Sequence, residues 1–202
     1  MERRGSKFLA LNWRRNEMQY YKMMFDGRPK RQNDIMARSR TKIENTYILY
    51  DGVVISDWDN NMVFEYDPEY GSVATEYLGN VYGWSIFSEK AIQLLGDLIL
   101  NDVQLLPIKV VNKDTGREIE KYFVVNVLPF LDALDLENSV HFDLGDGEVS
   151  VVKYGIKEEK VRGHHIFRLK DSQFSVFVSE EFYKIAKKNK MLGCDFLKVK
   201  TS

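Results

Sequence analysis

Two stretches, WSIFSEKAIQLL at residues 84–95 and SVFVSEEFYKIA at residues 175–186, repeat the same pattern. In each stretch alternating apolar residues lead into Ser-Glu, and apolar residues at helical spacing follow. Ser88 and Ser179 stand where a helix N-cap belongs, since a serine hydroxyl there accepts a hydrogen bond from an otherwise unpaired amide of the first turn. Each stretch therefore predicts a strand that runs directly into a capped helix.

The repeat continues beyond the two helices at a constant offset. Ser179 follows Ser88 by 91 residues (179 − 88), and the same offset carries Val103 onto Cys194. These two positions open the apolar runs VQLLPIKVV and CDFLKVK, so a strand, a capped helix and a second strand occur twice. We predict an α+β fold with mixed or antiparallel sheets, a few helices and two similar strand-helix-strand units.

Most other segments have the composition of strands and turns. Residues 18–26 predict a first strand, and residues 27–45 predict a long loop or a weak helix. Two short strands are expected on either side of Asp51-Gly52, a dipeptide that favours tight hairpin turns because both residues tolerate positive φ. Further turns are expected at residues 112–116 and 143–147, and a hairpin is expected over residues 164–179 with its tip near 170–172.

The chain divides into a short extension and a folded domain. Residues 1–17 show no strand pattern, and we interpret them as a flexible N-terminal extension or tag. Residues 18–202 are expected to form the α+β domain, either as one sheet system or as two lobes at about 18–111 and 112–202. A chain of this length buries a sizeable core without a metal or a disulfide.

The composition indicates a cytoplasmic protein. The single cysteine, Cys194, excludes an internal disulfide, which is typical of a reducing compartment. No apolar run reaches the roughly 18 to 20 residues that a membrane span needs. The opening sequence, MERRGSKFLALNW, has too short an apolar stretch for a secretory signal.

Charge is unevenly spread along the sequence. Residues 1–45 hold 12 Lys or Arg and 5 Asp or Glu, which leaves 17 basic (29 − 12) and 25 acidic (30 − 5) residues for 46–202. A basic arm of this kind is able to bind nucleic acid or acidic lipid, although its charges are interleaved with Asn, Gln and Met, as in a solvated terminus. The acidic remainder favours a basic protein partner.

The residues that often carry catalysis are scattered. Asp132, Asp135 and Glu137 have the composition of an acid/base pair or a cation site, but they lack the spacing of a calcium loop and are better interpreted as turn or capping acids. His164 and His165 are neighbours, so on a strand they point to opposite faces and do not share a zinc ion. No nucleophile elbow or phosphate-binding loop is present, and we expect no catalytic residue, metal or cofactor.

Aromatic and acidic residues crowd one region of the sequence. Rings supply rigid contact area and acids select a basic partner, so this composition is typical of a protein-binding surface as well as of a core. We expect the partner-binding residues to be Asp57, Trp58, Asp59, Glu69, Tyr70 and Tyr77.

Five segments, taken in order, carry a resemblance to a known family. They are DWDNNMVFEYDP, YGWSIFSEKAIQLL, VQLLPIKVVNKDTGREIEKYFVVNVLPFLDALDLENS, HHIFRLKDSQFSVFVSEEF and LGCDFLKVK. This order resembles the bacterial immunity-protein family typified by the Myxococcus immunity protein of polymorphic toxin systems. The resemblance covers about residue 18 to the C-terminus, and the residues on its pattern are Trp84, Ser88, Asp135, Ser139, Phe167, Arg168 and Ser179.

The resemblance implies a protein that neutralises a cognate toxin by stoichiometric binding and has no catalytic residues of its own. A small cytoplasmic enzyme that uses scattered acids and His, or a nucleic-acid-associated protein that uses the basic N-terminal arm, stays open as an alternative. For Arg168, strand alternation in HHIFRLK predicts a pairing with a carboxylate, with Asp135 as the candidate.

Overall fold

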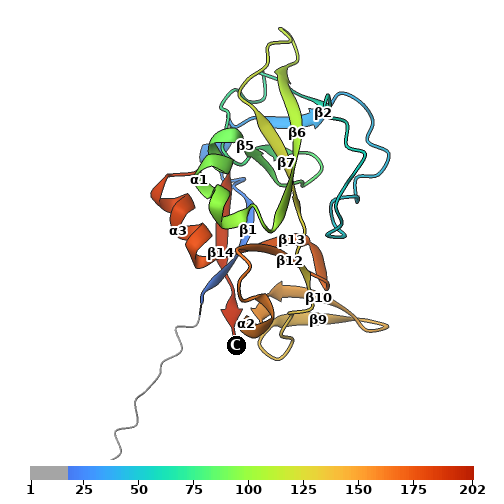
Figure 1. The fold of residues 1–202 in the computed structure, drawn as a ribbon, viewed down its shortest axis with the longest axis vertical. Coiled ribbons are helices and arrows are strands. Elements are labelled where there is room, and N and C mark those ends of the chain that lie inside the picture. Colours follow the sequence, from blue (N-terminus) through green and yellow to red (C-terminus); the bar gives the residue numbers. More distant parts are fainter. Residues whose placement is uncertain (1–17) are drawn as a thin grey trace, which may run out of the picture.

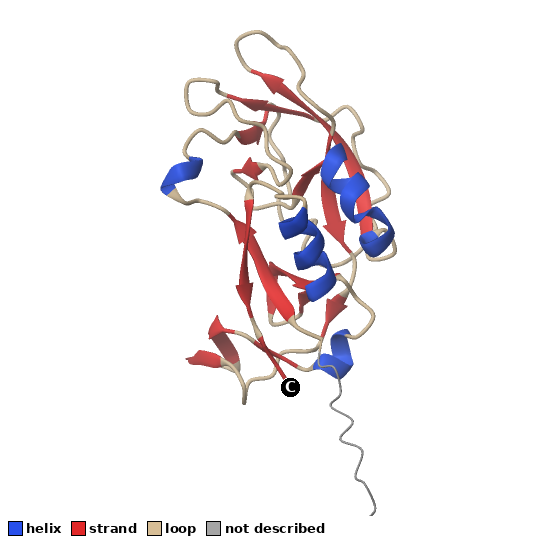
Figure 2. Ribbon diagram, turned by 90° about the vertical axis from the view of Figure 1, so that its left-hand side faces the viewer, coloured by secondary structure: helices blue, strands red, loops and turns tan. Residues whose placement is uncertain are grey.

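The computed structural model describes residues 18–202 and contains two main sheets, which lie one above the other in Figure 1. The upper sheet has the order β4-β2-β3-β6-β7-β5, and the lower sheet has the order β14-β1-β13-β12-β8. The expected extension, residues 1–17, lies outside the described residues. The α+β class predicted from the sequence is confirmed, with mixed and antiparallel sheets and three short helices in the described part (Figure 2).

The upper sheet consists of β2 (Met36–Ser39), β3 (Val63–Tyr66), β4 (Gly79–Asn80), β5 (Ile86–Ser88), β6 (Val103–Asn112) and β7 (Tyr122–Val127). The lower sheet consists of β1 (Tyr20–Phe25), β8 (Phe130–Leu131), β12 (Ile166–Leu169), β13 (Ser172–Ser179) and β14 (Cys194–Lys198). Two strand pairs lie apart from these sheets, β9 (Val140–Gly145) with β10 (Glu148–Lys153) and β11 (Gly155–Ile156) with β15 (Lys200–Thr201). The helices are α1 (Glu89–Ile99), α2 (Glu158–Val161) and α3 (Glu180–Lys188), with a 3-10 turn η1 at Pro29–Arg31.

Both predicted caps are present. The Ser88 hydroxyl accepts a hydrogen bond from the Ala91 amide at 3.2 Å, and the Ser179 hydroxyl accepts one from the Phe182 amide at 3.3 Å. Helices α1 and α3 begin directly at the ends of β5 and β13, and they pack against each other through a shared apolar core. The strand-to-helix units inferred from the repeated sequence are therefore confirmed.

The pairing registers of the two units match residue for residue. In the upper sheet Ser88 pairs with Tyr122, and Val103 pairs with Val127 five positions further along β7. In the lower sheet Ser179 pairs with Tyr20, and Cys194 pairs with Phe25 five positions further along β1. Each unit thus holds two parallel strands with one antiparallel strand between them, although β7 follows its unit in the chain and β1 precedes its unit.

Each half of the chain contributes one strand to the sheet that the other half mainly forms. β7 lies after residue 111 but belongs to the upper sheet, and β1 lies before residue 111 but belongs to the lower sheet. The expected division into lobes at residue 111 therefore does not follow the sheets, since each sheet takes strands from both sides of it.

Two local predictions differ from the structure. Residues 27–45 contain η1 and β2, whereas a loop or a weak helix was expected. The two strands expected around Asp51-Gly52 do not form, and the backbone there is irregular. Leu49, Tyr50 and Ile55 are each buried against the upper sheet. Their spacing in the sequence therefore resembles that of a strand, although the backbone forms no strand pairing.

Asp135 organises the turn that leads into β9. Its carboxylate accepts hydrogen bonds from the Ser202 hydroxyl at 2.5 Å, from the Asn138 side chain at 2.6 Å and from the Asn138 amide at 3.2 Å. These bonds, with that from Ser202 the largest cause, lower the pKa of Asp135 below its usual range. The interpretation of Asp135 as a turn acid agrees with this geometry.

We predict that Ser88→Ala and Ser179→Ala each lower the free energy of unfolding by about 1 kcal/mol, because each leaves a first-turn amide without its acceptor. Ser179→Ala should cost more, since the Ser179 hydroxyl also lies 2.9 Å from Nδ1 of His165. Urea denaturation measures both. Ser150→Ala on the exposed face of β10 is the control, and equal effects at all three serines would contradict the capping role.

Candidate partner-binding surface

The exposed side chains of residues 45–59, together with Phe174, make up the surface that we call the loop face. Tyr47, Val53 and Val54 are about 60% exposed, at 62%, 61% and 62%. In Figure 1 this segment runs along one side of the molecule and descends toward the level of β13. Rings and branched aliphatic side chains on an irregular, anchored segment are typical of contact residues.

Side chains of the upper sheet anchor the loop backbone. Gln104 of β6 accepts a hydrogen bond from the Ile55 amide at 2.9 Å and donates one to the Ile55 carbonyl at 2.7 Å. Asn126 of β7 donates to the Val53 carbonyl at 2.8 Å. At Gly52, φ is +66°, and an added Cβ would lie 2.5 Å from the Leu128 carbonyl oxygen, so only glycine fits this close approach. The loop is thus held in one conformation without strand pairing.

Phe174 connects the loop to the lower sheet. Its ring is 58% exposed and lies 4.9 Å from the Tyr50 ring and 6.1 Å from the Tyr47 ring, both in edge-on contacts. Tyr50 is buried, so it fixes the two exposed rings from below. The aromatic part of the loop face is therefore built at the junction of the two sheets.

Arg168 lies under this aromatic cluster. Its guanidinium is buried, stacks over the Tyr50 ring at 5.0 Å and donates one hydrogen bond to the Gln173 carbonyl at 2.7 Å. Burial lowers the pKa of Arg168 to about 10. The expected pairing with Asp135 is wrong: Asp135 binds the turn residues described above, and no carboxylate among residues 18–202 forms an ion pair with Arg168.

The acids of this region form an uninterrupted run in the sequence. Residues 43–89 contain nine Asp or Glu and no Lys or Arg. Glu65, Asp67 and Glu76 form ion pairs with bases from outside the run. Within the described part of the chain, the acids of the run that lack an ion pair are Asp51, Asp57, Asp59 and Glu69. Three of these four lie on the loop face, which gives it negative charge beside its rings.

The structure separates the six residues expected to contact a partner. Asp57 and Asp59 are exposed on the loop face. Trp58, between them, is half-buried, because its indole Nε1 donates to the Pro107 carbonyl at 3.0 Å and its ring packs 6.1 Å from that of Trp84. Trp58 therefore anchors the two acids rather than projecting with them.

Glu69 and Tyr70 lie just beyond the C-terminal end of β3, whereas residues 45–59 precede its N-terminal end. Tyr70 is 74% exposed and borders a cavity of about 280 Å³, which is also lined by Arg38 and Lys113. The four residues of β3 separate this patch from the loop face, which precedes the strand, by roughly 13 Å along the strand. Tyr77, in contrast, is buried with its ring 5.5 Å from that of Phe87, so it is a core residue and offers no surface to a partner.

A groove extends from Phe174 along the lower part of the same side of the molecule. It has a volume of about 520 Å³ and is bounded by β10 and by the turn between β12 and β13. Leu144 and Tyr154 contribute apolar walls, and Lys170 and Asp171 lie at the rim. The apolar residues of this groove thus extend the loop face downward from Phe174. No simple pattern in the sequence predicts this extension.

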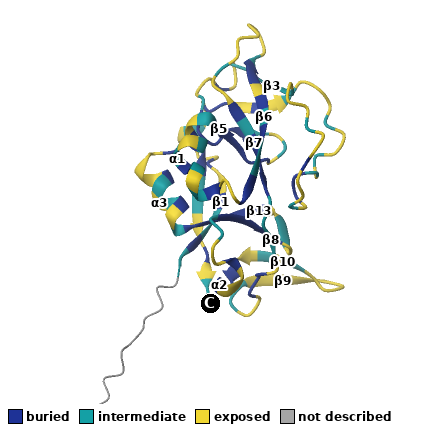
Figure 3. Ribbon diagram, viewed as in Figure 1, coloured by how far each residue is buried: buried dark blue, intermediate teal, exposed yellow. Residues whose placement is uncertain are grey.

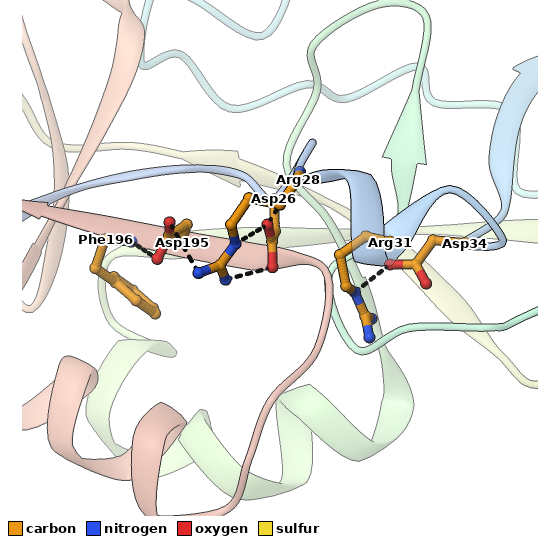
Figure 4. Close-up of polar contacts among 6 residues, drawn as sticks. All are labelled: Asp26, Arg28, Arg31, Asp34, Asp195 and Phe196. Carbon is orange, nitrogen blue, oxygen red and sulfur yellow. Dashed lines mark hydrogen bonds and ion pairs between the residues drawn. The ribbon is translucent and has the colours of Figure 1, made fainter.

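A cluster of charges near the end of β1 neutralises itself. Figure 4 shows Arg28 donating two hydrogen bonds to Asp26, at 2.5 and 2.6 Å, and reaching Asp195 at 3.8 Å. Arg31 Nε lies 2.7 Å from Asp34 Oδ2 in the same view. The bonds from Arg28 hold the pKa of Asp26 below its usual range, whereas burial raises that of Asp34. These pairs join β1, η1 and β14 and leave no acid free for chemistry.

Two of the three histidines, His164 and His165, are engaged in structural contacts. His164 Nδ1 lies 2.7 Å from Asp102, and His165 Nδ1 lies 2.9 Å from the Ser179 hydroxyl. Across residues 18–202, no three or more His, Cys, Asp or Glu side chains gather in an arrangement that would hold a metal ion. In the same range, no helix has the length and apolar character needed to cross a bilayer.

Comparison with known proteins gives one family match. The model of an immunity protein family, Imm11, matches residues 12–201 of the 202-residue chain. The match begins six residues before the described part of the chain, so it includes part of the segment expected to be an extension. No curated protein matches the sequence.

We predict that Arg168→Lys lowers the free energy of unfolding by about 1 to 3 kcal/mol, because a point charge cannot stack on Tyr50 while it reaches the Gln173 carbonyl. Arg168→Met should cost less, since it keeps the length and removes a buried charge that has no ion-pair partner. Denaturant unfolding compares both with Arg117→Lys in an exposed turn. A greater loss with Met than with Lys would show that the charge itself is needed.

Proposed function

The chain belongs to the Imm11 immunity protein family, and from this membership we propose that it neutralises a cognate toxin by binding it in a one-to-one complex, without turnover. The loop face is the proposed centre of contact, with Glu69 and Tyr70 as a second contact area. A standard interface covers about 800 Å² on each partner, so one toxin surface is wide enough to reach both areas across β3.

The observation that supports this proposal is that one anchored segment carries both an exposed ring and acids that lack an ion pair in the described structure. Tyr47 and Phe174 are held rigid by the buried Tyr50, which lowers the entropy lost when they contact a partner. Asp51, Asp57 and Asp59 are exposed on the same segment as Tyr47, without a base nearby in the sequence. Apolar anchors rimmed by charge are the usual anatomy of a protein interface.

The sign of the charge suggests the chemistry of the toxin. An acidic surface attracts a basic one and steers the encounter, which raises the association rate more than the affinity. Toxins that act on nucleic acid carry basic surfaces for their substrate, and a partner of that kind would fit the loop face. The toxin surface facing the 45–59 segment is therefore proposed to be rich in Lys and Arg.

The nucleic-acid alternative has less support in the described residues. In residues 18–45, the described part of the basic arm, most Lys and Arg are engaged in ion pairs: Arg28 binds Asp26, Arg31 binds Asp34, and Arg38 and Arg40 both bind Glu65. Charges neutralised in this way release few counterions on binding a phosphate backbone. A protein partner therefore agrees better with the arrangement of charge.

We predict that titration of the purified toxin with this protein inhibits it with an endpoint near one equivalent. Binding without turnover requires a molecule of this protein for each toxin molecule inhibited. A toxin that co-purifies with this protein from its host strain is the probe, and its activity is measured after a fixed preincubation. Full protection by a small fraction of an equivalent would indicate catalysis and contradict the proposal.

We predict that the triple variant Asp51→Lys, Asp57→Lys, Asp59→Lys lowers the association rate about tenfold or more at low salt and reduces its dependence on salt. Stopped-flow or surface-based kinetics at several salt concentrations measure both. The matched control reverses three exposed acids elsewhere, Asp114, Glu118 and Glu159. An equal loss in the control would assign the effect to net charge and remove the loop face from the interface.

A further inference from the structure

A cleft opens in the lower sheet where β1 and β13 part. The antiparallel pairing of these two strands ends at Met23 opposite Val176. Beyond that pair, β1 continues beside β14 with Met24 opposite Asp195, whereas the part of β13 that begins at Ser172 pairs with β12. In Figure 3 both strands lie in the middle of the molecule, below β5 and β7 of the upper sheet. The opening is therefore a consequence of the strand pairing itself.

Both halves of the fold supply walls to this cleft, which has a volume of about 380 Å³. Met24, Phe25 and Phe174 come from the lower sheet, and Gly79 and Trp84 come from β4 and the segment before β5. A Cβ at Gly79 would lie 2.7 Å from the Phe25 ring, so the glycine leaves room for that ring. Mainly apolar and aromatic walls around a volume of this order are typical of ligand sites.

Lys22 gives the cleft a positive charge. It is the only charged residue that lines the cleft, and it forms no ion pair within residues 18–202. Its Nζ lies 4.9 Å from the centroid of the Tyr154 ring. The next acid along the chain, Asp26, already accepts two hydrogen bonds from Arg28. An anion in the cleft would therefore meet a cation and no competing acid in the walls.

Arg168 places a second positive charge behind the cleft. Its Nε is buried without a hydrogen-bond partner in the described structure, and its guanidinium stacks on the Tyr50 ring. Tyr50 touches the cleft wall, because its ring lies 4.9 Å from that of Phe174 and its hydroxyl lies 3.9 Å from the position of a Cβ at Gly83. No described carboxylate compensates Arg168, so its charge adds to the positive potential of the cleft.

We propose that this cleft binds a carboxylate carried next to an apolar side chain, and that an acidic residue of the toxin supplies it. The apolar walls would enclose the neighbouring side chain while the carboxylate lies toward Lys22. The inference rests on the proposed function, since Phe174 belongs to both the cleft and the loop face. It adds a specificity that the loop face cannot impose, because a wholly basic toxin surface would leave Lys22 without a partner.

Two probes of similar shape test the chemistry of the cleft without the toxin. Phenylacetate and phenylacetamide differ mainly in charge, and titration of the isotope-labelled protein with each is followed by NMR. We expect phenylacetate to shift the amides of Gly79 and Gly83, which line the cleft, and to bind about fivefold more tightly than phenylacetamide. The amide of Gly116, in an exposed turn, is the reference. Equal affinities, or no shift at the two cleft glycines, would overturn the proposal.

Substitutions at Lys22 test whether this side chain supplies the charge. Lys22→Met should remove most of the preference for phenylacetate, and Lys22→Glu should reverse it in favour of phenylethylammonium, a cation of similar shape. Lys188→Met removes an exposed lysine from α3 and should keep the wild-type preference, so it is the matched control. A preference for phenylacetate that survives in Lys22→Glu would overturn the assignment of the anion to this cleft.

The occupant is tested with a toxin that co-purifies from the host strain. Lys22→Glu and Met24→Trp, which fills the cleft, should each raise the dissociation constant about tenfold, mainly through faster dissociation. Urea denaturation controls for the fold of both variants. An unchanged affinity in both, while the loop-face charge reversal still weakens binding, would overturn the toxin as occupant and leave the proposed function intact. Failure of the wild type to inhibit at one equivalent would overturn the proposed function, whereas the probe titrations decide the carboxylate preference separately.

Discussion

Each of the two main helices begins at a serine that serves two partners, and this double role sets the architecture. The side chains of Ser88 and Ser179 cap α1 and α3, while their backbones pair with Tyr122 and Tyr20 in the neighbouring strands. Because the cap sets where the helix begins and the pairing sets the strand register, a shift at either serine would displace a helix from the shared core. The packing of α1 on α3 then joins the two sheets.

The parts of the fold that the sequence predicts well are those governed by local chemistry. The serine caps, the helical apolar faces and the turn at 112–116 depend on residues within a few positions of each other, and the structure contains all of them. The strand that completes each unit depends instead on distant pairing. Nothing near Tyr20 indicates that β1 pairs with β13 and β14, more than 150 residues away. The sequence therefore could not predict that β1 pairs in the lower sheet and β7 in the upper sheet.

The same distinction applies to the candidate site. Trp58, Tyr70 and Tyr77 are similar residues in similar surroundings in the sequence, yet one anchors a loop, one is exposed and one is core, because tertiary packing decides burial. Composition predicted Asp57 and Asp59 as candidate contact residues, and both are exposed. The absence of Lys and Arg from residues 43–89 was a further signal in the sequence, and it points to the whole loop. Phe174 had no such signal, since its partner rings lie more than 120 residues away.

Arg168 shows why the proposed interface belongs to the whole domain rather than to one segment. It comes from β12 of the lower sheet, yet it stacks on Tyr50 from the loop between β2 and β3 of the upper sheet. Its bond to Gln173 fixes the turn that carries Phe174. A buried guanidinium without a carboxylate adds little to stability, so its value lies in holding these parts in one arrangement. The loop face consequently exists only when both sheets are assembled, and an unfolded or half-folded chain would present no preformed surface to a partner.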